Sequence, residues 1–241
     1  MRPLYRSFAV RAVFQAVVRR IIVIATAAAA LFPQAAQAAP TIEPLKPCYR
    51  SVDEVTTENV HVAAGGFSPD SPVDVSIDGA VVADDVFTNK DGFVSGDVKA
   101  PFRATGERAF TLTVTEPDKP VNTVSYTSRV TALAMRLKPR KAKPSKKVRF
   151  IGRGFTDNGA TMVYAHYVRA GKLRKTVALG APEGPCGTID GKHRQIPISK
   201  PKTGRWTLQV DSQAVYSPQP AGVFVRLAIT VRRVLRAQPR R

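Results

Sequence analysis

The feature of this sequence that most limits its possible folds is an internal repeat. Val60–Ser68 reads VHVAAGGFS and Val148–Thr156 reads VRFIGRGFT, so both segments alternate apolar residues and close on Gly-Phe followed by a hydroxyl side chain. Later in each half, Gly106–Val114 matches Gly204–Val210. A solenoid needs at least three stacked copies, and only two are present. The repeat therefore predicts two tandem domains of one fold.

Hydrophobic alternation with a period of two residues runs through both copies. Val73, Val75 and Ile77 alternate with polar residues, and Val223–Val231 carries five apolar residues at alternate positions. Such alternation is typical of strands with one buried face. Turn signals such as Asp78-Gly79 recur every 8–12 residues, and no segment sustains a helical period. We therefore expect an all-β chain: two tandem immunoglobulin-like β-sandwich domains after a signal peptide.

We call the two pairs of matching segments the first and second landmarks. The first, or Gly-Phe, landmark has a structural interpretation. Glycine permits a bulge or a close backbone approach where the strand ends, and the aromatic ring can then fill the end of a sandwich core. Phe67 and Phe155 hold this position in the two copies, and Phe110 and Trp206 are the aromatic residues of the second landmark. We predict that all four side chains are buried.

The N-terminus has the three parts of a secretory signal. Met1–Arg20 carries five arginines and no acid, Ile21–Phe32 is a mostly apolar run of twelve residues, and Ala36–Ala38 is an Ala-x-Ala cleavage site. A membrane-spanning helix needs roughly 20 apolar residues, so this run is too short. We assign residues 1–38 to a cleavable signal peptide, with no transmembrane anchor after cleavage, and expect a secreted or envelope-associated protein.

Charge divides the remaining chain into two unlike halves. Residues 39–131 hold 8 Lys and Arg against 14 Asp and Glu, a net charge of −6. Residues 132–241 hold 24 against 4, a net charge of +20. Each half has about the length of one sandwich domain. We therefore predict an acidic first domain at 39–131 and a basic second domain, ending in a basic tail, at 132–241.

The basic half suggests an anionic partner, because clustered cations bind polyanions by releasing counterions. The candidate polyanion-binding residues are Lys138, Arg140, Lys141, Lys143, Lys146, Lys147, Arg169, Lys172, Arg174 and Lys175. Cell-wall or other extracellular polyanions are the expected partners. Specific nucleic-acid recognition is not expected, since no aromatic residues, on which nucleobases could stack, lie between these lysines and arginines. Two other roles for the charge stay open: solubility, and docking of the basic domain on its acidic neighbour.

The two cysteines, Cys48 and Cys186, lie 138 residues apart, one in each half. An even count without metal-ligand spacing, in an exported protein, favours a disulfide. The alternative is a free thiol at Cys186, with His193 and Asp190 nearby in the sequence as candidate base and orienting acid. That arrangement would indicate an enzyme or enzyme accessory of cell-wall metabolism. A free thiol at Cys186 would favour this enzyme function, and a disulfide would favour a binding module.

Neither a cofactor nor a metal is expected. The three histidines are far apart in the sequence, without metal-ligand spacing, and His166 has the position of an ordinary strand residue. Asp84, Asp85 and Asp91 lie close together but lack the alternate oxygen ligands and the terminal glutamate of a calcium-binding loop.

Several motifs resemble a known group of domains. Gly65–Gly79 (GGFSPDSPVDVSIDG), followed by Asp91–Phe93 and Thr111–Val114, resembles the immunoglobulin-like modules of bacterial surface proteins, including the IPT/TIG type. The second half, with Gly152–Phe155 and Gly184–Gly187, is similar to the C-terminal half of uncharacterised exported proteins of high-GC Gram-positive bacteria. The resemblance implies a sandwich fold and an extracytoplasmic location, and no reaction. We therefore expect a non-enzymatic structural or binding module.

Overall fold

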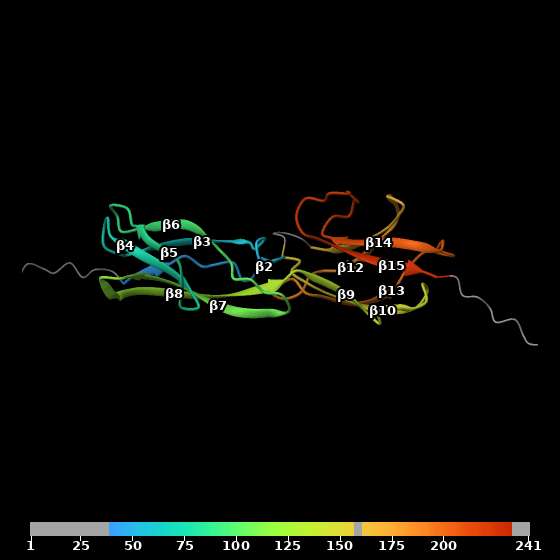
Figure 1. Cartoon of the computed structure of the whole chain (residues 1–241), viewed down its shortest axis with the longest axis horizontal. Helices are drawn as coiled ribbons and strands as arrows, with labels where there is room; N and C mark the ends of the chain where they lie inside the picture. The colour runs from blue at the N-terminus through green and yellow to red at the C-terminus, as the bar shows by residue number, and fades with distance from the viewer. Residues whose placement is uncertain (1–38, 157–160, 233–241) are drawn as a thin grey trace, which may run out of the picture. The chain divides into compact units, whose positions relative to one another are not determined.

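A computed structural model describes residues 39–156 and 161–232 of the chain (Figure 1). The predicted signal peptide, residues 1–38, lies outside the described residues, as does the basic tail beyond Arg232. Every regular element within the described ranges is a β-strand, which confirms the all-β class. In the same ranges no helix has the length and hydropathy needed to cross a membrane.

The first half of the described chain forms two sheets. Its strands are β1 (Thr41–Ile42), β2 (Tyr49–Ser51), β3 (Asn59–Gly65), β4 (Pro72–Ile77), β5 (Ala80–Phe87), β6 (Val94–Lys99), β7 (Glu107–Glu116) and β8 (Lys119–Ala132). One sheet has the strand order β1-β3-β6, and the other has the order β2-β8-β7-β4-β5. Neighbouring strands are antiparallel, except that β2 runs parallel to the last residues of β8.

The second half repeats this strand order. Its strands are β9 (Ala134–Lys138), β10 (Lys147–Arg153), β11 (Val163–Arg169), β12 (Lys172–Gly180), β13 (Ile189–Arg194), β14 (Gly204–Asp211) and β15 (Phe224–Val231). They form sheets of order β9-β10-β13 and β12-β11-β14-β15. These orders match β1-β3-β6 and β5-β4-β7-β8, strand for strand. Among the described residues, β2 has no counterpart in the second half.

Each half encloses its own hydrophobic cluster. One cluster draws on Leu45–Val130, and the other draws on Met135–Val231, so the chain holds two β-sandwich cores. The four landmark aromatic residues lie inside them, with exposed fractions of 3% for Phe67, 1% for Phe110, 2% for Phe155 and 3% for Trp206. The prediction that these side chains are buried is confirmed.

The Gly-Phe landmark closes on a second glycine in each half. The Phe67 amide donates to the carbonyl of Gly92, and the Phe155 amide donates to the carbonyl of Gly187, both over 3.2 Å. Gly92 and Gly187 have φ angles of 71° and 57°, and a Cβ on either would lie 2.1 or 2.2 Å from the phenylalanine carbonyl oxygen. Only glycine fits so close to the backbone at positive φ. The repeat therefore extends to a pair of glycines outside the two segments that match in sequence.

Candidate functional site: the basic surface of the second sandwich

The structure contains the predicted disulfide between Cys48 and Cys186. The two sulfur atoms lie 2.03 Å apart and the Cα atoms 5.2 Å apart, and both residues are buried. Cys186 therefore has no thiol to act as a nucleophile. The proposed neighbours also have other partners: His193 Nε2 lies 3.1 Å from the Leu179 carbonyl, and Asp190 accepts two hydrogen bonds from Arg149. The three residues do not form a catalytic group in this structure.

Antiparallel pairing gathers the basic residues at one end of the second sandwich. β10 begins at Lys147, opposite Arg194 at the end of β13, and β14 begins at Gly204, opposite Val231 at the end of β15. The hairpin between β11 and β12 turns back at this same end, because the last residues of β11 pair with the first part of β14. A hydrogen bond of 3.4 Å from the Tyr167 hydroxyl to the Arg194 carbonyl joins the two sheets there.

We call this region the basic end. Its residues belong to the connection before β10, the connection after β13, the β11–β12 hairpin and the adjoining strand ends. They are Arg140, Lys141, Lys143, Lys146, Lys147, Arg169, Lys172, Arg194, Lys200, Lys202, Arg205 and Arg232. The described acids of the second half lie elsewhere: Glu183 beside the disulfide, Asp190 near the start of β13 and Asp211 at the end of β14. Within the described residues, no ion pair with a carboxylate neutralises a base of this end.

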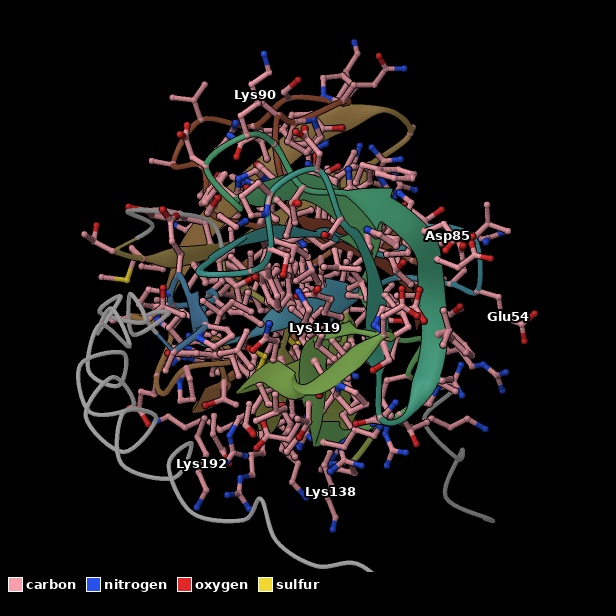
Figure 2. All side chains as sticks on the ribbon, turned by 90° about the vertical axis from the view of Figure 1, so that its left-hand side faces the viewer. Glu54, Asp85, Lys90, Lys119, Lys138 and Lys192 are labelled. Atoms are coloured by element: carbon pink, nitrogen blue, oxygen red, sulfur yellow. A yellow bond between two sulfur atoms is a disulfide. The ribbon has the colours of Figure 1, made fainter. Side chains whose placement is uncertain are left out.

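A second group of bases lies on the outer face of the three-stranded sheet. Strand register places Lys138, Arg149 and Lys192 directly opposite one another on β9, β10 and β13. Such neighbours across strands are about 5 Å apart. Figure 2 shows Lys138 and Lys192 projecting from the same side of the molecule. Arg149 also forms a bidentate pair with Asp190, at 2.5 Å for each bond, which raises the pKa of the arginine through hydrogen bonding and charge.

Besides Arg232, six bases of these two surfaces are not among the predicted residues. Lys200, Lys202 and Arg205 reach the basic end through the connection after β13 and the start of β14. Arg149, Lys192 and Arg194 lie within or at the end of strands and not in a run of consecutive bases. The signal of these strand residues is alternation: Lys147 and Arg149 in β10, and Lys192 and Arg194 in β13, are two residues apart and flank a residue that is less exposed. A strand with one buried face puts such bases on one outer surface. The period of two, applied to charge as well as to hydrophobicity, could have found them.

The connection before β10 borders a groove of about 580 Å³. Arg140, Lys141 and Lys143 lie on one side of it, and residues 228–232 of β15 and its end lie on the other. The connection is fastened away from β15, since the amides of Gln195 and Ile196 donate to its carbonyls over 2.9 Å. The groove therefore lies between this fastened connection and the end of β15.

The ten predicted polyanion-binding residues fall into three places. Seven belong to the basic end: Arg140, Lys141, Lys143, Lys146, Lys147, Arg169 and Lys172. Lys138 lies on the outer face of the three-stranded sheet, where it meets Arg149. Arg174 and Lys175 are exposed on β12, two and three residues beyond the start of that edge strand. No interaction places these last two beside the groove, so the surface centres on the other eight.

His166 is a buried residue with hydrogen-bond partners on every side. Its Nδ1 lies 3.0 Å from the Thr176 hydroxyl, and its Nε2 lies 3.1 Å from an Asp211 carboxylate oxygen and 2.9 Å from the Gln213 carbonyl. Since both partners of Nε2 are acceptors, this nitrogen carries the proton. Burial pushes the pKa of Asp211 up, but hydrogen bonds from His166, Gln209 and Gln213 outweigh it and lower the pKa.

This buried pair serves packing and cannot reach a ligand. The side chain of His166 has no exposed surface. Two residues after β14 contact it: the Gln213 carbonyl at Nε2, and the Tyr216 ring, which is tilted by 54° with its centroid 5.7 Å away. In the described ranges no three His, Cys, Asp or Glu side chains come together as a metal site.

Comparison with known proteins assigns no family to the chain. No family model and no curated protein matches it. Among solved structures it is similar to dimeric latent PorU from Porphyromonas gingivalis, with 14% identity over 82% of this chain and 21% of that one, at a TM-score of 0.27. The β-glucuronidase of Parabacteroides merdae gives 9% identity over 80% and 24%, at a TM-score of 0.24. The chain spans about a quarter or less of either protein, and similarities this low carry no functional argument.

Proposed function

We propose that this protein is an extracytoplasmic, non-enzymatic pair of immunoglobulin-like domains that binds anionic polymers through its second sandwich. The observation that supports the proposal most is the basic end, which combines twelve Lys and Arg side chains with no described carboxylate. Arranging so many like charges together costs free energy in the folded state through mutual repulsion. An anionic partner would relieve that repulsion.

The immunoglobulin-like assignment rests on strand order. Leaving β2 aside, the first, second and fifth strands of each half form one sheet, and the third, fourth, sixth and seventh form the other. Immunoglobulin-like sandwiches share the placement of the first, second and fifth strands in one sheet and of the third, sixth and seventh in the other; the fourth strand, which can differ between members of this architecture, here pairs with the third. The IPT/TIG or bacterial immunoglobulin-like modules that the motifs resemble are its proposed relatives, and the boundary between the two domains is proposed near residue 132, where β8 ends.

The extracytoplasmic location has two supports. The disulfide requires oxidising surroundings in which to persist, and residues 1–38 have the composition of a secretory signal. Polyanions of the cell wall or the extracellular space would then be within reach of the basic surface. With Cys186 in a disulfide, no observation favours the alternative of an enzyme or enzyme accessory in cell-wall metabolism with a site near that residue.

Salt-dependent binding tests the proposal. The protein should bind heparin or teichoic acid at about 50 mM salt, with an affinity that falls linearly on a log–log plot against salt. Arg140→Gln with Lys143→Gln should reduce that slope by about 1.5, since each cation removed from the interface accounts for roughly 0.7–0.9. The matched control is Lys90→Gln with Lys99→Gln, which removes the same charge from exposed positions of the first half. Absent binding, or equal losses in both double variants, would refute the proposal.

A further inference from the structure

The two sandwiches differ at one sheet edge. β8 and β15 are equivalent, each being the last strand of the larger sheet. In the first sandwich β2 extends this sheet by pairing in parallel with Val130–Ala132, the last residues of β8. In the second sandwich no strand of the described chain pairs with the outer edge of β15. A free edge presents N–H and C=O groups at every second residue, ready to pair with another chain.

The groove of the basic end lies along this free edge. It is bordered by residues 228–232, the last two of which, Val231 and Arg232, match in position Val130 and Thr131 at the end of β8 that pairs with β2. Its other wall is the connection 140–144, whose Arg140 and Pro144 carbonyls accept hydrogen bonds from the Gln195 side chain and the Ile196 amide and not from β15. The groove therefore overlaps the place that a counterpart of β2 would fill, and it continues along β15 from there.

The lining of the groove indicates the chemistry of an occupant. Four bases surround it: Arg140, Lys141, Lys143 and Arg232. The other eight lining residues include no acid, and six of them are apolar. A sheet edge, small and aliphatic walls and a basic rim together complement an extended chain that carries carboxylates.

We infer that the outer edge of β15 is a strand-addition site for an extended acidic peptide, which lies parallel to β15 as β2 lies parallel to β8. Main-chain hydrogen bonds to residues 228–232 supply affinity, and the four bases select for acidic side chains. The chain's own residues 233–241 are a poor complement, because they carry four arginines and no acid. This strand-addition site shares basic residues with the proposed polymer-binding surface, but its partner is a peptide and not a polyanionic polymer.

Amide exchange on the disulfide-bonded full chain tests strand addition directly. The probe is the blocked peptide acetyl-(Glu-Val)4-amide at about 50 mM salt. Binding should slow the exchange of alternate backbone amides within residues 228–232, because those amides gain hydrogen-bond acceptors. The same peptide with alternate amides N-methylated keeps its charge but loses donors, and it should bind at least about tenfold more weakly. A (Lys-Val)4 peptide should not bind.

A pair of alanine variants separates the edge from overall charge. Ala228 and Ala178 are both exposed, on β15 and β12, the two edge strands of the same sheet. Ala228→Asp places a carboxylate in the groove, against the acidic peptide, and should weaken peptide binding about tenfold, because like charges brought together in an interface repel each other. Ala178→Asp, with the same charge change, should leave binding within about twofold.

Four results would overturn the inference. They are equal effects of the two variants, equal binding of the N-methylated peptide, peptide binding without protection of residues 228–232, and absence of peptide binding while heparin still binds. The last outcome leaves polymer binding standing, and loss of both peptide and heparin binding refutes both proposals. Protection of residues 228–232 without peptide, abolished by removing residues 233–241, would assign the edge to the chain's own tail.

Discussion

The close approach of Gly187 to Phe155 makes a quantitative prediction about stability. In Gly187→Ala the new Cβ would lie 2.2 Å from the Phe155 carbonyl oxygen and 2.4 Å from its carbon, so the backbone must move. Alanine at a φ of 57° costs about 1 kcal/mol, and breaking the hydrogen bond from the Phe155 amide costs about 1 more. Shifting Phe155 forfeits part of the roughly 3–5 kcal/mol that its burial provides. We therefore expect the free energy of unfolding to fall by about 3–5 kcal/mol.

Gly171→Ala is the matched control, because Gly171 has a φ of 72° but no atom within 4 Å of the added Cβ. This substitution should lower the free energy of unfolding only by the cost of placing alanine at a positive φ, about 1 kcal/mol. The assay is urea unfolding followed by the fluorescence of Trp206, the only tryptophan, which is buried in the same sandwich. Gly92→Ala, followed by circular dichroism, repeats the test in the first sandwich. If Gly187→Ala unfolds at the same urea concentration as Gly171→Ala, the reasoning from the close approach is refuted.

Three further predictions concern the cores and the disulfide. Phe110→Ala should lower the free energy of unfolding by about 3–5 kcal/mol, measured by urea titration, and a neutral effect would contradict its place in the core. Burial would raise the pKa of Glu116, but hydrogen bonds from Asn122, Ser68 and Lys119 lower it from 4.5 to about 2. The ionised Glu116 therefore contributes fully to stability above pH 4.5, and this contribution is lost as the pH falls toward 2. Over that range the free energy of unfolding of the wild type should drop more steeply than the free energy of unfolding of Glu116→Gln, and parallel curves would exclude the effect. Cys48→Ala with Cys186→Ala opens a loop of 138 residues and should cost up to about 5 kcal/mol in the same titration, and an unchanged free energy of unfolding would contradict the disulfide.

Much of the candidate site was visible in the sequence as a set of residues but not as a surface. The run Lys138–Lys147 is conspicuous because its bases are neighbours in the chain. That Arg149 lies between Lys138 and Lys192, and that Arg140 borders the same groove as the end of β15, depends on which strands pair and in what register. Register couples residues that are distant in the chain, and one sequence contains no local signal for it.

The sequence by itself determined the strand character of the chain, the two-fold repeat, the buried aromatic landmarks and the imbalance of charge. These properties follow from periods of two residues, from turn chemistry and from composition, all of which act over short distances along the chain. Only the tertiary structure decided that Gly187 is the partner of Phe155 and that His166 and Asp211 meet in the interior. It also decided that β8 pairs with β2, while no strand of the described residues pairs with the outer edge of β15. Each of these depends on interactions between distant segments, which exist only once the sheets have packed.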